Sequence, residues 1–204
     1  FKGGHLALSH NGNFTNTGIL RDRLEDEGTL FQTTTDSELA LHLIARSREE
    51  HMVDKILDAF RQIEGAYSIC ILTDDKLFAV RDPHGVRPLA FGKLEESFVF
   101  ASETCAFDII SADYIRDVEP GEVIMIDRSV LESGKEESFS IGQAEKFKHC
   151  IFEYIYFSRP DSMIFEEKVD KVRRKLGKSL AEESPAPQRI SDDEKKVAVI
   201  NVPD

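Results

Sequence analysis

The hydrophobic pattern changes its period once, at Gly65, and this change limits the folds open to the chain. Before Gly65, apolar residues recur at helical spacing over residues 17–27, after Thr35, and over residues 53–60. After it, short apolar runs bounded by turn residues predict strands at 66–72, 77–80, 88–91, 98–101 and 121–126, the last with a continuation toward Leu131. Helices followed by strands on short connections favour antiparallel sheets flanked by helices over a doubly wound parallel sheet. We therefore predict an α+β fold.

The first predicted strand covers residues 5–9 and breaks at Asn11-Gly12-Asn13. Asn-Gly supplies the positive φ angles of a hairpin turn, so a turn is one interpretation. A helix follows instead of a partner strand, which favours a second interpretation. In that one, the Asn11 side-chain amide and the Gly12 main-chain N–H form an oxyanion hole that stabilises a developing negative charge.

Thr35-Asp36-Ser37-Glu38 has the spacing of a capping box, with Thr35 as the N-cap and Glu38 three residues later. Asp36 then occupies the first helical position. Acidic side chains favour that position because of the helix dipole. A carboxylate there is also suited to binding the α-amino group of an amino acid, and both interpretations of Asp36 stay open.

Residues 81–89 combine three charged side chains, His84, a glycine and two prolines between predicted strands. We expect a rigid turn with internal ion pairs. His84 has no second His or Cys at ligand spacing nearby, so we expect it to be structural.

A Ser-, Glu- and Gly-rich stretch at residues 129–144 is the predicted boundary between two domains, 1–144 and 145–204. Beyond it we predict an apolar strand at 150–157, a turn at 159–162, an amphipathic helix at 166–183 with a lysine-rich face, and a buried strand at 197–202. This order suggests the start of an α/β domain.

The net charge indicates which partners to expect, and the cysteine content indicates the cellular compartment. The formal net charge is -12, from 26 Lys and Arg against 38 Asp and Glu. An acidic surface repels nucleic acid and anionic lipid, so we expect neither as a partner. Three widely spaced cysteines, Cys70, Cys105 and Cys150, do not form a disulfide framework, which favours a cytoplasmic protein. For Cys150 the default is a buried, unreactive thiol.

Six short segments, read in order, resemble motifs of the amidophosphoribosyltransferases. They are Leu8-Ser9-His10-Asn11-Gly12-Asn13, Thr35-Asp36-Ser37-Glu38, Gly65-Ala66-Tyr67-Ser68, residues 81–89, Ala101-Ser102-Glu103-Thr104-Cys105-Ala106 and Val118-Glu119-Pro120-Gly121-Glu122. Residues 152–162, Phe-Glu-Tyr-Ile-Tyr-Phe-Ser-Arg-Pro-Asp-Ser, are similar to the start of the transferase domain of that family.

The resemblance implies a four-layer αββα N-terminal nucleophile hydrolase domain that releases ammonia from glutamine. The α/β phosphoribosyltransferase domain then uses Mg²⁺ and phosphoribosylpyrophosphate to make 5-phosphoribosylamine, the first step of purine synthesis. It also implies that Asn11 and Gly12 form the oxyanion hole and that Asp36 binds the glutamine amino group. Cys150 matches one of the four cysteine ligands of a 4Fe-4S cluster in the iron–sulfur subset of the family, and the assembly implied is a homotetramer.

The sequence departs from the family pattern at its ends. The family nucleophile is an N-terminal cysteine, whereas this chain begins with Phe1, and the motif that binds the ribose hydroxyls and Mg²⁺ is also missing. We therefore expect a piece of the enzyme that is inactive alone. The rival interpretations are the glutaminase domain of another amidotransferase and a catalytically inert binding or regulatory module.

Overall fold

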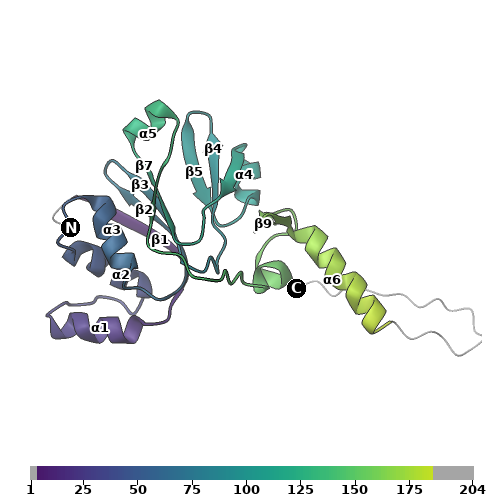
Figure 1. Cartoon of the computed structure of the whole chain (residues 1–204), viewed down its shortest axis with the longest axis horizontal. Helices are drawn as coiled ribbons and strands as arrows, with labels where there is room; N and C mark the ends of the chain where they lie inside the picture. Colours follow the sequence, from purple (N-terminus) through teal and green to yellow (C-terminus); the bar gives the residue numbers. More distant parts are fainter. Residues whose placement is uncertain (1–3, 186–204) are drawn as a thin grey trace, which may run out of the picture.

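The computed structural model describes residues 4–185, which form two larger antiparallel sheets with helices on their outer faces and one two-stranded sheet (Figure 1). The first sheet has the order β1-β2-β3-β7-β8, and the second has the order β5-β4-β6. The strands of the first sheet are β1 (Leu6–Phe14), β2 (Gly65–Thr73), β3 (Leu77–Arg81), β7 (Glu122–Ile126) and β8 (Glu137–Ser140). Those of the second are β4 (Ala90–Leu94), β5 (Ser97–Ala101) and β6 (Asp113–Asp117).

Three helices cover one face of the first sheet: α1 (Thr17–Asp26), α2 (Asp36–Arg46) and α3 (Met52–Phe60) (Figure 1). Strand alternation sends Tyr67, Ile69 and Ile71 of β2 to this side, where they pack with buried residues of the helices such as Ile44 and Phe60. Each fully buried large apolar side chain contributes about 1.5–3 kcal/mol. This core therefore fixes β1 and β2 against the helices.

The other face of the first sheet packs on the second sheet. Ala79 and Ile124 meet Leu89 and Phe91 in a separate buried cluster. On the outer side of the second sheet lies α4 (Cys105–Ile110), and a Cβ at Gly92 would lie 2.9 Å from the Phe107 ring, so strand and helix pack closely there. Helices, sheet, sheet and helix give the four layers that the family resemblance implies, and the α+β fold class is confirmed.

Several predicted strand limits are wrong. β1 does not break at Asn11-Gly12-Asn13, because each residue from Leu6 to Phe14 pairs with β2. The predicted strand at 88–91 begins only at Ala90. No strand continues from Ile126 toward Leu131, because Asp127 caps a new helix, α5 (Arg128–Ser133), by accepting hydrogen bonds from two of its main-chain N–H groups. The strands β6 and β8 were not predicted from the sequence.

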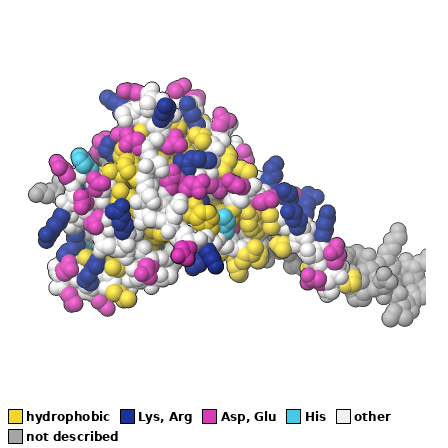
Figure 2. Space-filling model, viewed as in Figure 1, with side chains coloured by type: hydrophobic (Ala, Val, Ile, Leu, Met, Phe, Trp, Pro, Cys, Tyr) yellow, Lys and Arg dark blue, Asp and Glu magenta, His cyan; other side chains and the backbone are white. Residues whose placement is uncertain are grey.

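The apolar run at residues 150–157 is not a strand. It forms a turn followed by a π-helix, η1 (Glu153–Phe157). Its buried residue is the charged Glu153, while Ile155, Tyr156 and Phe157 are more than half exposed. Apolar side chains gather on the surface between the sheets and α6 (Val169–Glu183), and lysines and arginines follow α6 (Figure 2).

The remaining predictions for the second part have mixed outcomes. The turn at 159–162 is confirmed, with Ser162 N donating to Arg159 O, and the short strands β9 (Met163–Ile164) and β10 (Glu167–Lys168) follow it. The helix predicted at 166–183 is present as α6, which extends away from the sheets (Figure 1). The strand predicted at 197–202 lies outside the described residues, and the division at 144/145 stays a prediction.

Among residues 4–185, no helix is both long enough and apolar enough to cross a lipid bilayer.

Candidate active site

One edge of β1 is open to a ligand at Gly12. The residue opposite Gly12 in β2 is Tyr67, whose carbonyl oxygen accepts from Asp82 N at 2.9 Å and whose N–H donates to Asp82 Oδ2 at 3.2 Å. Both main-chain groups of Tyr67 therefore point away from β1, toward β3. Since main-chain groups alternate between the two edges of a strand, the N–H and the carbonyl of Gly12 face the unpaired edge of β1.

Glycine is required at position 12 by both conformation and space. Gly12 has a φ of +152°, and a Cβ there would lie 2.0 Å from Ala66 O and 2.7 Å from Tyr67 Cα. Position 12 therefore permits close strand pairing only without a side chain. The open edge keeps one exposed main-chain N–H at a fixed place.

Asp36 lies at the same edge of β1. As predicted, it is the first residue of α2, and its Oδ2 accepts a hydrogen bond of 3.0 Å from the N–H of Phe14. Phe14 and Gly12 are two residues apart, about 7 Å along the strand, and their N–H groups face the same way. The structure thus brings Gly12 and Asp36 to one edge. A carboxylate has about four acceptor sites, so Asp36 keeps capacity for a cationic ligand.

His10 orients the Asp36 carboxylate. Its ring stacks on Phe14 at 4.6 Å, and its Nδ1 lies 3.3 Å from Asp36 Oδ1 and 3.2 Å from Ser37 Oγ. Burial lowers the pKa of His10 below its ordinary value, although the Asp36 carboxylate opposes the change. A carboxylate only accepts hydrogen bonds, so a neutral imidazole that bonds to it through Nδ1 must carry its proton on Nδ1. Nδ1–H of His10 is therefore the donor to Asp36.

The side-chain amide of Asn11 points to the opposite face of β1, toward the second sheet. Arg87 Nη2 donates to Asn11 Oδ1 at 2.7 Å, and Asn11 Nδ2 donates to Ser102 Oγ at 3.0 Å. A guanidinium has only donors, so Arg87 fixes which end of the amide is the oxygen. Of the two Nδ2 hydrogens, one goes to Ser102 and the other remains available.

Residues 81–89 form a turn between strands, as predicted, and hydrogen bonds to the backbone hold it. The buried Asp82 accepts hydrogen bonds from the N–H groups of Tyr67, His84 and Val86. Arg81 donates to the carbonyls of Arg87, Val118 and Gly85. No ion pair joins side chains within this turn, so the expectation of internal ion pairs is wrong. His84 Nδ1 meets Lys146 O at 3.1 Å, a structural contact.

The capping box predicted at the beginning of α2 is only partly confirmed. Thr35 is the N-cap in position and has extended dihedral angles, but its side chain makes no capping hydrogen bond. Glu38 accepts instead from the main-chain N–H groups of Gln32 and Thr33, at 2.7 Å each. The hydrogen bond from the Gln32 N–H, and after it the one from the Thr33 hydroxyl, lower the pKa of Glu38 to about 2. Glu38 therefore holds the loop before α2.

The three cysteines are all free thiols in different settings. Burial raises the pKa of the Cys70 thiol to about 11, which suppresses the reactive thiolate. Cys105 is buried at the start of α4. Cys150 is half-buried in a loop, where its N–H donates to Val86 O, and does not start a strand. Within residues 4–185, no group of three or more His, Cys, Asp and Glu residues could hold a metal ion.

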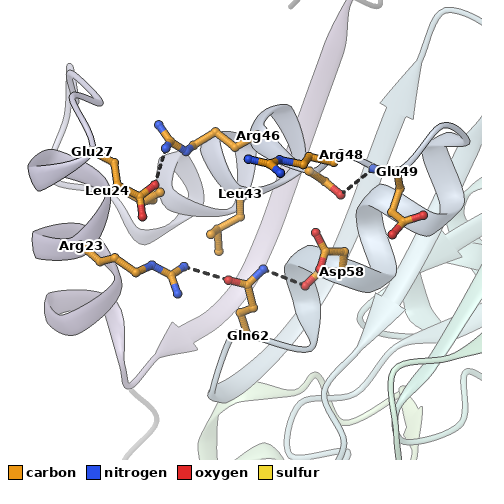
Figure 3. A pocket seen from close by; sticks show the side chains of 10 residues that line it. Arg23, Leu24, Glu27, Leu43, Arg46, Arg48, Glu49, Asp58 and Gln62 are labelled. Atoms are coloured by element: carbon orange, nitrogen blue, oxygen red, sulfur yellow. Dashed lines mark hydrogen bonds and ion pairs between the residues drawn. The ribbon is translucent and has the colours of Figure 1, made fainter.

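A separate polar hollow lies among α1, α2 and α3 (Figure 3). Arg46 pairs with Glu27 across it, and Arg23 donates to Gln62 Oε1 at 2.8 Å. It includes neither Asn11, Gly12 nor Asp36. Since the hollow lies apart from these three residues, we assign it no part in the candidate site.

Three residues that the structure brings to Asn11 were not predicted from the sequence, namely Arg87, Ser102 and Glu153. Arg87 and Ser102 contact Asn11 directly, and Glu153 contacts Arg87. Each lies inside one of the segments that resemble family motifs, and this was the available signal. Arg87 and Ser102 lie 76 and 91 residues from Asn11 along the chain, so no local sequence pattern links them to Asn11.

Comparison with known proteins finds relatives in the family that the sequence motifs resemble. Residues 1–108 match the family described as "Glutamine amidotransferase domain". The chain is 46% identical over 182 residues to an amidophosphoribosyltransferase of Rhizobium etli, a match that covers 89% of this chain and 37% of that protein. It is 45% identical over 181 residues to the amidophosphoribosyltransferase of Bacillus subtilis, with the same two coverages. The chain thus spans a little over a third of the length of these relatives.

A solved structure agrees. The glutamine phosphoribosylpyrophosphate amidotransferase of Bacillus subtilis, in complex with ADP and GMP, superimposes with a TM-score of 0.86 at 41% sequence identity. This match covers 92% of the present chain and 40% of that structure. The family match covers more than half of the chain, and the four layers are those expected of the fold. The chain belongs to the glutamine amidotransferase domain family.

Proposed function

We propose that the complete protein to which this chain belongs is an amidophosphoribosyltransferase. It hydrolyses the side-chain amide of glutamine to glutamate and ammonia. The ammonia then displaces pyrophosphate from phosphoribosylpyrophosphate and gives 5-phosphoribosylamine. In this proposal the chain supplies most of the glutaminase unit and the segment that leads into the transferase unit.

The extent of the similarity carries this proposal. The family match ends at residue 108, but the likeness to the two amidophosphoribosyltransferases extends over 182 and 181 residues. It therefore includes β6, β7 and much of the segment beyond them, which a likeness between glutaminase units alone would not require. This favours an amidophosphoribosyltransferase over another glutamine-dependent enzyme.

The geometry supports one role for Asn11 and Gly12 and a different role for Asp36. The free Nδ2 hydrogen of Asn11 and the edge-facing N–H of Gly12 are the donors for the oxyanion that forms when a thiolate attacks the amide. The thiolate belongs to an N-terminal cysteine of the mature protein, as the family resemblance implies. The half-exposed Asp36 binds the α-amino group of glutamine.

The remaining expectations are part of the same proposal. Mg²⁺ serves the transferase unit, the assembly is a homotetramer, and the protein works in the cytoplasm. In the same proposal, the half-buried Cys150 supplies one of the four ligands of a 4Fe-4S cluster, and the other three lie outside the described residues.

Glutamine-dependent release of pyrophosphate from phosphoribosylpyrophosphate tests the proposal. The complete protein should release pyrophosphate with glutamine or with ammonium as nitrogen donor, and Asn11→Ala should lower only the glutamine-dependent rate, by about 10²–10³-fold. Glutamine hydrolysis without pyrophosphate release would favour another amidotransferase. Absence of both activities would favour an inert binding module.

A further inference from the structure

Arg87 joins the candidate oxyanion hole to the segment that follows the glutaminase sheets. Its Nη2 donates to Asn11 Oδ1 at 2.7 Å, and its Nη1 lies 2.9 Å from Glu153 Oε1 in η1. The guanidinium carbon lies 4.9 Å from the centre of the Phe157 ring, also in η1. One planar group thus contacts both Asn11 and η1.

Glu153 holds the guanidinium in place. It is 2% exposed, and a buried carboxylate requires a charged or hydrogen-bonding partner. Its Oε2 accepts from Ser158 Oγ at 2.9 Å, which leaves Oε1 for Arg87. No other cation pairs with Glu153 within residues 4–185. The orientation of Arg87 is therefore set from the side of η1.

The main chain of Arg87 is fixed independently. Its carbonyl accepts from Arg81 Nε at 2.9 Å and from Ser68 Oγ at 3.3 Å. Cys150 N–H binds Val86 O in the same turn. The backbone around Arg87 therefore stays in position when its side chain is changed.

The second partner of Asn11 is tied to the same segment. Ser102 precedes Glu103, which accepts from Arg159 N at 2.8 Å and from Ser162 Oγ at 2.7 Å. Thr104 Oγ1 accepts from Met163 N at 2.8 Å. Both loops that contact the Asn11 amide, at Arg87 and at Ser102, are thus clamped by residues 150–163.

We propose that Arg87 is a positioning residue for glutamine hydrolysis, which Glu153 holds against Asn11 so that the amide presents Nδ2, and not Oδ1, to the oxyanion. This inference rests on the proposed function. Without Arg87, rotation of the amide by 180° exchanges donor for acceptor. The oxyanion would then face a carbonyl oxygen.

Arg87→Lys in the complete protein tests the proposal. Lysine keeps a positive charge for Glu153, but its single nitrogen cannot reproduce the fork between Asn11 and Glu153. The glutamine-hydrolysis kcat should fall by about 10-fold, with the glutamine KM unchanged. Glu153→Gln should lower kcat in the same way, because the hold on Arg87 is lost.

A double variant separates positioning from general damage. If Arg87 acts through Asn11, Asn11→Ala combined with Arg87→Lys should be no slower than Asn11→Ala alone. Arg116→Lys is the matched control, since Arg116 makes a comparable fork to the buried Glu122 at 2.8 and 2.9 Å, away from Asn11. It should leave kcat unchanged.

Two results would overturn the proposal. One is an Arg87→Lys protein with the kcat of the starting protein. The other is a double variant in which the two losses multiply. If no variant and no starting protein hydrolyses glutamine, the proposed function fails instead. In that case the melting temperatures still report whether Arg87 and Glu153 are coupled.

Discussion

The carboxylate of Asp36 accepts a 3.0 Å hydrogen bond from the main-chain N–H of Phe14, 22 residues earlier in the chain. This bond ties the beginning of α2 to the open edge of β1. It places a negative charge about 7 Å along the strand from the edge-facing N–H of Gly12. A small ligand with a cationic end and a carbonyl end fits such an arrangement of charge and donor.

Replacing Asp36 with Asn should weaken glutamine binding without unfolding the protein. The Asn side-chain oxygen still accepts from Phe14, but the charge for the ammonium group is lost. A charged hydrogen bond of about 1.5–3 kcal/mol corresponds to a rise in KM of about 10- to 100-fold. Steady-state glutamine hydrolysis by the complete protein measures it.

The control for Asp36 is Asp54→Asn, in the first turn of α3. It removes the same charge from the first turn of another helix and should leave KM unchanged. Ammonia-dependent synthesis should survive in Asp36→Asn, and a parallel loss there would point to misfolding and not to a binding role.

Replacing Gly12 with Ala should destabilise the fold. The new Cβ would meet Ala66 O at 2.0 Å in a backbone conformation that side chains rarely adopt. We expect a loss of at least about 1–3 kcal/mol in the free energy of unfolding, measured by chemical denaturation. Gly18→Ala in α1, where nothing lies within 4 Å of the new Cβ, should stabilise by about 0.5–1 kcal/mol. Equal effects of the two variants would contradict the assigned conformation of Gly12.

Replacing Asp82 with Asn should destabilise the turn that orients Tyr67. Both carboxylate oxygens of Asp82 accept main-chain N–H groups, whereas Asn offers one oxygen and directs an amide N–H at another donor. An unsatisfied buried polar group costs about 1–3 kcal/mol. Thermal unfolding should show this loss. Asp22→Asn, on the exposed side of α1, should stay within about 0.5 kcal/mol of the starting protein.

The stability of the protein should depend on His10 at mildly acidic pH. Burial lowers the pKa of His10 in the fold, so below its ordinary value of 6.5 the unfolded state binds the proton first. Stability is therefore fully present above about pH 6.5 and decreases as the pH falls toward the lowered folded pKa. His149, whose pKa burial also lowers, adds to the same slope.

Comparison of the starting protein with His10→Gln isolates this contribution. The slope of unfolding free energy against pH below about pH 6.5 should be smaller in the variant, because the contribution of His10 is gone. His5→Gln, at an exposed side chain, is the control and should keep the slope. An unchanged slope in His10→Gln would mean that His10 is not buried as described.

Local pattern was sufficient for most of the helices and strands. The apolar period placed α1, α2, α3, β2 and β3 within a few residues, and the acidic first turn placed the beginning of α2 at Asp36. The short-range rule was misleading at Asn11-Gly12. A hairpin signal is local, but pairing of β1 with β2 along all nine residues outweighs it.

Residues 150–157 are a second segment at which the local sequence pattern was misleading. Their apolar content predicted a strand, yet no neighbouring strand among the described residues pairs with them, and the segment winds into η1. The residue it buries is Glu153, because Arg87 supplies the charge that makes this burial possible. A partner 66 positions earlier cannot be read from a local run of apolar residues.

The sequence alone determined the residue types available for chemistry: an amide at Asn11, a conformationally permissive Gly12 and a carboxylate at the beginning of a helix. The tertiary structure decided where those groups face. Asp82 engages both main-chain groups of Tyr67 and thereby leaves Gly12 turned to the open edge, while Arg87 fixes the Asn11 amide. The physical reason is that hydrogen-bond direction depends on partners brought together by folding, whereas composition and period depend only on neighbours along the chain.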